Sequence, residues 1–267
     1  MLKDITLGQF FPGNTIIHRL DPRTKLLWLV VYIVALFLAK SYFSYALMAL
    51  VFISVTLLTK IRAKALFSGL KPLLFIVIFT GLVNLFYGSG EPLVQFWIFK
   101  ITANGIRSAV FMVLRIILLI CGTFLLTYTT SPLQLTDGLE LLLNPLKKIR
   151  IPVHELALMM SIALRFIPTL IEETDKIMSA QKARGAAFDT GKLPERAKAL
   201  IPLLVPLFVS AFRRADELAT AMESRCYHDG EGRTRMKVLH FAGRDVAALC
   251  LALLILIAVC VLRHFGL

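Results

Sequence analysis

Two short segments each place an arginine between small residues, and both follow a stretch with helical periodicity. The first is Ala183-Arg184-Gly185, and the second is Ser224-Arg225-Cys226. A guanidinium group carries five donors in a fixed fork, so an arginine at a helix tip can bind carboxylates or carbonyl groups of another protein. Alternatively, each arginine only stabilises the dipole of its own helix, by about 0.3–1 kcal/mol. Two matched tips favour a surface that grips a partner.

Motifs for catalysis are missing from the sequence. Gly191-Lys192 is followed by Leu193 rather than Ser or Thr, so no phosphate-binding loop is formed and we expect no nucleotide hydrolysis by this chain. His154-Glu155 begins like the helix of a zinc protease, but Leu158 stands where the second ligand would be. The four cysteines form no Cys-x-x-Cys pair. We therefore expect no enzymatic activity, no cofactor and no metal site.

The composition indicates a membrane protein, because 57% of the 267 residues are hydrophobic. A helix needs about 20 mostly apolar residues to cross roughly 30 Å of hydrocarbon. Five segments approach or reach that length with their flanks: residues 26–39, 41–59, 72–87, 108–129 and 246–262. The predicted fold class is an all-α, multi-pass integral membrane protein with about five transmembrane helices and long cytosolic amphipathic helices.

Basic residues in the connections predict the orientation. Residues 60–71 contain the basic residues Lys60, Arg62, Lys64 and Lys71 and no acid. In residues 88–106 the only charged residues are Glu91 and Lys100. We expect the N-terminus and residues 60–71 and 131–245 on the cytoplasmic side of the cell membrane, and residues 88–106 outside. The net charge of +13 suits loops beside an anionic leaflet. It lies on no recognisable nucleic-acid-binding module, so we expect no nucleic-acid partner.

Three regions follow from these spans. Residues 1–130 form a membrane domain of four transmembrane helices, residues 131–244 form cytosolic coupling helices, and residues 245–267 form a C-terminal transmembrane helix. Ser131 and Pro132 fit a helix N-cap and first turn. Pro145 and Pro152 then separate a short helix from the next one.

The first long cytosolic helix is predicted from about Val153 to Arg184, and it is too charged to cross a bilayer. Pro168 should bend it, and Gly185 suits a left-handed C-terminal cap. The second contains residues 199–212, an apolar stretch that Pro202 and Pro206 interrupt and that is too short for a span. Its apolar surface must be covered by something.

Polar residues inside the predicted spans are few. No Asp or Glu lies within any of them, although a proton-coupled carrier usually keeps acids there. Arg115 is the one charged residue of residues 108–129. It either contacts a partner or a buried carbonyl group, or it snorkels to the outer interface. The sequence leaves these alternatives open.

Three long segments carry a family resemblance: HRLDPRTK at residues 18–25, LNPLKKIRIPVHELALMMSIALRFIPTLIEETDKIMSAQKARG at residues 143–185, and IPLLVPLFVSAFRRADELATAMESRCY at residues 201–227. Across essentially its whole length, the chain resembles the transmembrane coupling subunit of energy-coupling factor transporters, the EcfT family. It is most similar to the shared type, which serves several S-components.

The resemblance implies partners that supply the missing chemistry. Two cytosolic ABC-type ATPases would hydrolyse ATP, and a small membrane protein, the S-component, would capture a vitamin or other micronutrient. In the family, two Ala-Arg-Gly-type motifs dock on the ATPases. They correspond to Ala183, Arg184 and Gly185, without change, and to Ser224, Arg225 and Cys226, where both flanking residues differ. Cysteine does not allow the close approach to a partner that glycine gives at that position.

The resemblance also makes the apolar half-helices candidates for S-component contact. The predicted contact residues are Met159, Met160, Met178, Leu203, Leu207 and Phe208. Flexible thioether side chains suit a surface that accepts several partners. Alternatively, these residues only pack against one another and the spans. Two other functions remain: a secondary transporter that conducts solute through its own spans, and a membrane scaffold without transport.

Overall fold

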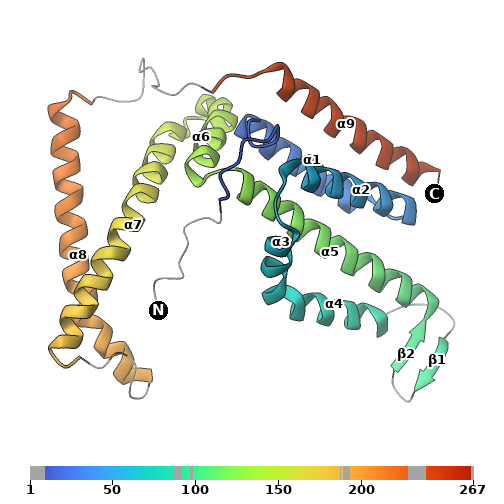
Figure 1. Cartoon of the computed structure of the whole chain (residues 1–267), viewed down its shortest axis with the longest axis horizontal. Coiled ribbons are helices and arrows are strands. Elements are labelled where there is room, and N and C mark those ends of the chain that lie inside the picture. The colour runs from blue at the N-terminus through green and yellow to red at the C-terminus, as the bar shows by residue number, and fades with distance from the viewer. Residues whose placement is uncertain are drawn as a thin grey trace. The chain divides into compact units, whose positions relative to one another are not determined.

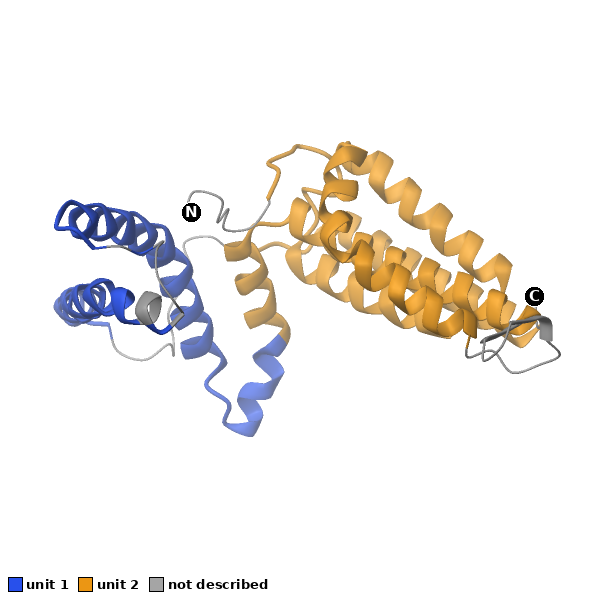
Figure 2. Cartoon of the chain, turned by 90° about the horizontal axis from the view of Figure 1, so that it is seen from below, with its two compact units in different colours: residues 1–7, 143–237 blue, residues 8–142, 238–267 orange. Residues whose placement is uncertain are grey.

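The computed structural model describes residues 10–86, 92–96, 99–186, 188, 193–227 and 239–265. The chain divides into two compact units, which Figure 2 shows in different colours. Unit 1 comprises residues 1–7 and 143–237, and unit 2 comprises residues 8–142 and 238–267. The predicted regions instead divide at residues 131 and 245, and their assignment to the membrane and the cytosol stays a prediction.

Helices make up nearly all of the described chain (Figure 1). Unit 2 contains α1 (Pro22–Leu38), α2 (Tyr42–Thr59), α3 (Ala63–Leu70), η1 (Lys71–Leu73), α4 (Leu74–Phe86), α5 (Ala103–Thr129), α6 (Pro132–Leu143) and α9 (Gly243–His264). Unit 1 contains η2 (Asn144–Ile149), α7 (Val153–Ala183) and α8 (Leu193–Ser224). A short antiparallel hairpin, β1 (Pro92–Phe96) and β2 (Phe99–Thr102), precedes α5 and was not predicted. The helical fold class is confirmed.

Five helical segments are long and apolar enough to cross a membrane. They are α2, the segment Ala63–Phe86, α5, α7 and α9. Four of these overlap predicted spans. The predicted span at residues 26–39 corresponds to α1, whose 17 residues extend about 26 Å. In place of α1, the fifth segment is α7, which was expected to be too charged to cross a bilayer. It is long and apolar enough because its charged residues gather in its second half, while the first half is apolar.

Several local predictions are confirmed. Ser131 and Gln134 form a reciprocal cap before α6, since each backbone N–H donates to the other's side chain at 3.3 Å. The helix after Pro152 begins at Val153, as predicted. The second long helix, predicted to continue past the apolar stretch, is α8, and it runs without a break through Pro202 and Pro206. The glycines Gly230 and Gly232 predict that residues 228–234 end this helix, and that segment lies outside the described residues.

The interior of unit 2 is built where α1 packs against α5 and α9, and α2 against α5. Its fully enclosed side chains include Ala35, Leu36 and Val259, and Tyr32 is nearly so. Close helix approach depends on a small residue here. A Cβ atom added at Gly122 of α5 would lie 2.7 Å from the ring of Tyr32. Small residues at such contacts let helix backbones approach inside a membrane.

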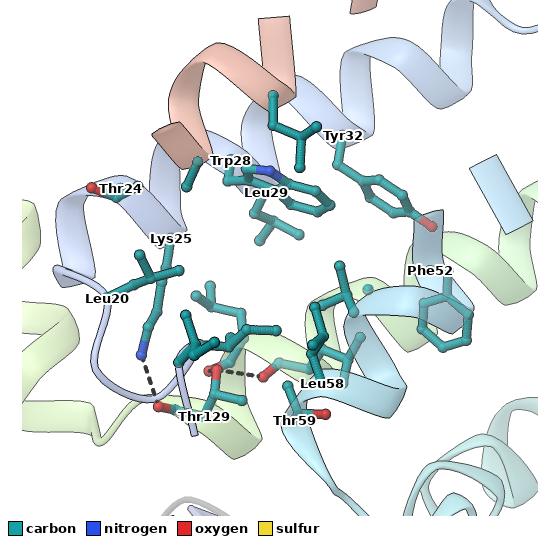
Figure 3. Close-up of a pocket in the computed structure, with 18 of the residues that line it drawn as sticks. Leu20, Thr24, Lys25, Trp28, Leu29, Tyr32, Phe52, Leu58, Thr59 and Thr129 are labelled. Atoms are coloured by element: carbon teal, nitrogen blue, oxygen red, sulfur yellow. Dashed lines mark hydrogen bonds between the residues drawn. The ribbon is translucent and has the colours of Figure 1, made fainter. Parts of the chain in front are cut away.

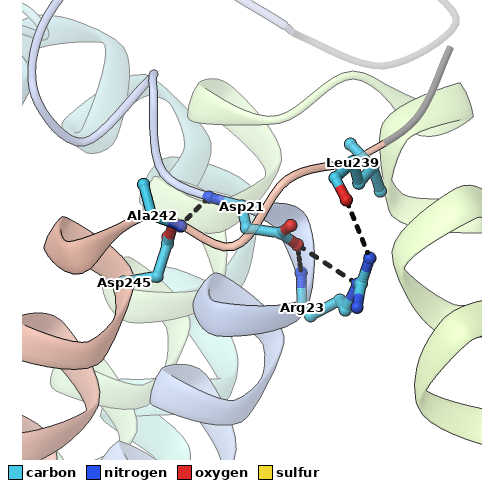
Figure 4. Close-up of polar contacts among 5 residues, drawn as sticks. All are labelled: Asp21, Arg23, Leu239, Ala242 and Asp245. Carbon is cyan, nitrogen blue, oxygen red and sulfur yellow. Dashed lines mark hydrogen bonds and ion pairs between the residues drawn. The ribbon is translucent and has the colours of Figure 1, made fainter.

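A network of charged side chains joins the N-terminal ends of α1 and α9 (Figure 4). The Asp245 carboxylate accepts the backbone N–H of Asp21 at 2.8 Å and that of Ala242 at 2.9 Å. Asp21 in turn caps α1, because its Oδ1 accepts the N–H of Arg23 at 2.9 Å. The Arg23 guanidinium donates to the carbonyl oxygen of Leu239 at 3.3 Å. One buried carboxylate therefore ties together two segments 224 residues apart.

Lys25 extends this network to the end of α5. Its Nζ donates to the carbonyl oxygens of Thr129, at 3.0 Å, and His18, at 3.2 Å, and to Thr130 Oγ1 at 3.2 Å. We call Asp21, Arg23, Lys25 and Asp245 the polar clasp. Residues 18–25 carry part of the family resemblance, and the structure gives three of them, Asp21, Arg23 and Lys25, a folding role.

Arg115 of α5 also has a structural role. Its Nε donates to the Tyr45 hydroxyl at 2.9 Å, and its Nη2 donates to the Ala39 carbonyl oxygen at 3.2 Å. Ala39 is the fully buried residue that ends α1. The alternative in which Arg115 reaches a buried carbonyl group is therefore confirmed.

The polar clasp can be tested with Asp245→Asn. The amide keeps one acceptor oxygen but loses the charge and the second acceptor, so a buried N–H of Asp21 or Ala242 loses its partner. Hydrogen bonds to charged groups contribute about 1.5–3 kcal/mol. Thermal unfolding in mild detergent should show a clearly lower midpoint. The exposed Asp216→Asn is the control, and equal midpoints for the two variants would contradict the role of the clasp.

Candidate docking site at the helix tips

The end of α7 is closed by a Schellman motif. The N–H of Ala186 donates to the Gln181 carbonyl oxygen, and the N–H of Gly185 donates to that of Lys182, both at 3.0 Å. Gly185 has φ +89°, the left-handed conformation that glycine adopts without strain, so the predicted cap is confirmed. Arg184 is the C-cap residue, and its side chain is exposed.

The end of α8 has the same backbone arrangement on a different sequence. The N–H of Tyr227 donates to the Met222 carbonyl oxygen at 3.0 Å, and the N–H of Cys226 donates to that of Glu223 at 2.9 Å. Cys226 has φ 54° and takes the position that Gly185 has in α7. Arg225 therefore occupies the C-cap position of α8 and is also exposed.

The flanking residues are exposed at both tips as well: Ala183, Gly185, Ser224 and Cys226. The structure thus presents two matched cations, each on a turn whose carbonyl groups are already partly satisfied by the cap. An exposed guanidinium group of this kind can donate to acceptors of another molecule. The departure of Ser224-Arg225-Cys226 from the Ala-Arg-Gly pattern leaves the hydrogen-bond pattern of the cap unchanged.

An ion pair joins the two long helices within unit 1. Arg214 Nη2 of α8 lies 2.9 Å from Glu173 Oε2 of α7, and the Ser210 hydroxyl donates to the other oxygen of the same carboxylate. Figure 1 shows α8 returning in the opposite direction along α7, so the two tips lie at opposite ends of the pair. Arg184 follows Glu173 by eleven residues, and Arg225 follows Arg214 by eleven residues. We call the Glu173–Arg214 ion pair the crossing point of the two helices. Each tip therefore lies about 16 Å from it along its own helix.

The predicted apolar contact residues divide into two groups. Met159, Met160 and Phe208 expose 57%, 47% and 61% of their surface, and Met178 and Leu207 are half-buried. Leu203 is only 7% exposed, so it belongs to the interior of the chain and not to an accessible surface.

Other apolar residues of α8 are exposed as well, including Val205 and Phe212, which were not among the predicted contacts. Both belong to the apolar stretch at residues 199–212, and Phe212 marks its end. Apolar identity alone could not separate them from Leu203, because the sequence does not reveal which side of α8 faces α7.

The fold and the tips define a class of protein: a helical membrane protein with two long helices that each end in an exposed arginine and that an ion pair joins. Residues 13–236 match the family model described as CbiQ, cobalt transport protein. A protein of Thermosediminibacter oceani named energy-coupling factor transporter transmembrane protein EcfT is 54% identical over 247 residues, 92% of this chain and 93% of that protein.

Two further relatives carry the same name. The protein of Clostridium kluyveri is 51% identical over 262 residues, 97% of each chain. The protein of Bacillus subtilis is 51% identical over 250 residues, 93% of this chain and 94% of that protein. The chain belongs to this family of transporter membrane proteins, as the resemblance of its sequence predicted.

The matched caps predict that Gly185→Ala and Cys226→Gly have opposite effects on the stability of the last turn of their helices. Gly185→Ala forces a side chain into the left-handed region, at a cost of about 1–2 kcal/mol. An added Cβ atom meets nothing within 4 Å, so the effect is purely conformational. Cys226→Gly removes the corresponding strain from α8. Amide hydrogen exchange in the last turn should become several-fold faster for α7 in the first variant and slower for α8 in the second.

Gly243→Ala is the matched control, because a Cβ atom there also meets nothing within 4 Å but the backbone is not left-handed. Exchange at both tips should stay unchanged in this variant. Faster exchange of α8 in Cys226→Gly would show that Cys226 stabilises the cap by contacts of its side chain.

Proposed function

We propose that the chain is the non-catalytic coupling subunit of an ATP-driven importer of the energy-coupling factor type. The observation that carries the proposal is the pair of matched caps, which hold Arg184 and Arg225 outward at opposite ends of one helix pair. The partners are two cytosolic ABC-type ATPases, one for each tip, and an S-component that binds a vitamin or other micronutrient.

The mechanism transmits movement through two rigid helices that pivot on each other at one contact. Each tip arginine donates to carboxylate or carbonyl groups of one ATPase. When ATP draws the ATPases together, the tips follow. The Glu173–Arg214 pair and the Ser210 hydroxyl hold the crossing point, so displacement of the tips rotates α7 and α8 against each other. With about 16 Å between the crossing and each tip, the two levers have equal length.

The charged half of α7 supports a cytoplasmic position for this helix pair. Glu172, Asp175 and Lys176 lie on α7 near the crossing, and charged side chains at the bilayer centre are costly. The N-terminus and residues 60–71 lie on the same side, and residues 88–106 lie on the outer side. The rival function, solute conduction through the spans of this chain, has no intramembrane acid to support it.

The exposed apolar side chains of α7 and α8 form the surface for the S-component. Met159, Met160 and Phe208 are its most accessible predicted members. Exposed apolar side chains outside the bilayer require a cover, and a membrane protein with its own apolar face supplies one. Rotation of α7 and α8 is then passed to the S-component directly and changes its orientation in the membrane.

The tips are tested by the double variant Arg184→Ala and Arg225→Ala. Truncating a hydrogen-bonded charge at an interface costs about 2–5 kcal/mol, and 1.4 kcal/mol corresponds to a tenfold loss of affinity. The variant should insert into the membrane but lose ATPase copurification and ATP-driven uptake. Arg213→Ala, which removes an exposed arginine from the same helix away from the tip, should retain both. Normal uptake by the double variant would refute the docking role.

The S-component surface is tested separately with Met160→Gln and Phe208→Gln. Each introduces a polar amide into an apolar contact, so capture of the S-component should weaken while the ATPases still copurify. Ala219→Gln, an exposed position on the charged half of α8, is the control and should change neither. Loss of both partners together, or of neither, would show that these positions are structural or unimportant.

A further inference from the structure

A cavity of about 240 Å³ lies inside unit 2 between α1, α2, α5 and α9 (Figure 3). Its walls include Trp28, Tyr32, Phe52 and Leu29, which surround the open space in the figure. This volume exceeds the roughly 150 Å³ of an engineered apolar cavity that stays dry and binds benzene. A space of this size therefore calls for an occupant.

The four helices line the cavity with the same part of their length. The lining residues extend from Thr24 to Tyr32 in α1, from Phe52 to Thr59 in α2, from Gly122 to Thr129 in α5 and from Arg244 to Leu251 in α9. Each stretch spans about 10 Å and lies at one end of its helix. The cavity thus begins where the helices end and extends about a third of the way through a 30 Å hydrocarbon core.

Most polar side chains in the wall use their polar atoms elsewhere, although the buried Thr24 Oγ1 has no hydrogen-bond partner within the described structure. Thr59 Oγ1 donates to the Thr56 carbonyl oxygen and Thr129 Oγ1 to that of Leu125, both at 2.7 Å. The Lys25 Nζ is occupied by its three acceptors in the polar clasp. The cavity therefore offers hydrocarbon surface, and water would gain few hydrogen bonds there.

The lining residues also reach the outer surface of unit 2. Ile16, Leu58 and Leu251 line the cavity and expose 62%, 54% and 55% of their surface. α2 and α9 are both long and apolar enough to cross a membrane. An opening bordered by exposed apolar side chains on such helices faces the hydrocarbon of the bilayer. The acyl chain of a lipid can therefore enter the cavity through it.

Arg244 supplies a polar recognition group at the shallow end. It lines the cavity from the first turn of α9, and its side chain is exposed. Within the part of the chain that the structure describes, no hydrogen bond or ion pair engages its guanidinium group. An arginine fork matches the oxygens of a phosphate group, which lies at the level where the hydrocarbon core begins.

We infer that the cavity is a binding site for an anionic phospholipid, with one acyl chain between the four helices and the phosphate on Arg244. Arg244 lies at the shallow end of the site, where the lipid headgroup would be. The apolar walls lie deeper, where the acyl chain would be. The bound chain would fill the gap between α1, α2, α5 and α9 and contact Trp28. This site is independent of the proposed docking of partners at the helix tips.

Fluorescence of Trp28 reports directly on the cavity. The only other tryptophan is Trp97, so a Trp97→Phe background leaves a single fluorophore. The full chain is reconstituted in phosphatidylcholine vesicles with a minor fraction of phosphatidylglycerol whose acyl chains are brominated. At equal mole fraction, brominated phosphatidylglycerol should quench Trp28 roughly fivefold more effectively than brominated phosphatidylcholine. Equal quenching by the two lipids would overturn the proposal.

Matched variants separate the headgroup from the tail. Arg244→Gln should abolish the preference for phosphatidylglycerol, whereas Arg263→Gln, an exposed arginine at the other end of α9, should keep it. Ala248→Phe fills the cavity and should weaken quenching by both lipids, whereas the neighbouring exposed Ala247→Phe should not. Val55→Phe is a second filling variant from α2 if Ala248→Phe is not monodisperse. Unchanged quenching in the filled cavity would overturn the proposal.

Discussion

The Asp245 carboxylate is the interaction on which the arrangement of unit 2 depends. It accepts two backbone N–H groups at the start of two helices, Asp21 before α1 and Ala242 before α9. Helix N-termini leave unsatisfied donors and carry partial positive charge, so one buried acid between two such ends is stabilised by both. Lys25 adds the end of α5 and supplies a nearby positive charge. The last helix of the chain is thereby held to the first.

The clasp also explains why charged residues are tolerated in the interior of this unit. A buried charge is costly unless it is paired and hydrogen-bonded. Here acids and bases are buried together at the helix ends, where backbone donors and acceptors are free to meet them. Gly138 of α6 packs on the same place, since an added Cβ atom would lie 2.8 Å from Pro22. The site that gathers the charges is thus also one of the tightest contacts between helices.

Sequence reasoning succeeded where local chemistry decides the structure. The cap at Ser131, the helix start at Val153 and the left-handed Gly185 all follow from the residue types within one turn. It failed to foresee that Cys226 adopts the conformation of Gly185, because the αL position is imposed by the end of α8 and not by cysteine itself. The partner of Arg115 and the burial of Leu203 depend on packing between segments far apart in the sequence, which no local pattern encodes.

The two prolines within α8 favour contact of this helix with protein over contact with lipid. Pro202 and Pro206 have no N–H to donate to the carbonyl oxygens of Lys198 and Pro202, although the helix continues through both. In water or beside a polar partner these oxygens find other donors, whereas in lipid each unsatisfied group costs several kcal/mol. The apolar side chains around the prolines are nevertheless exposed, Val205 by 58% and Phe208 by 61%. A surface that is apolar in its side chains and incompletely bonded in its backbone is suited to protein contact, because a protein can satisfy both requirements and lipid only the first.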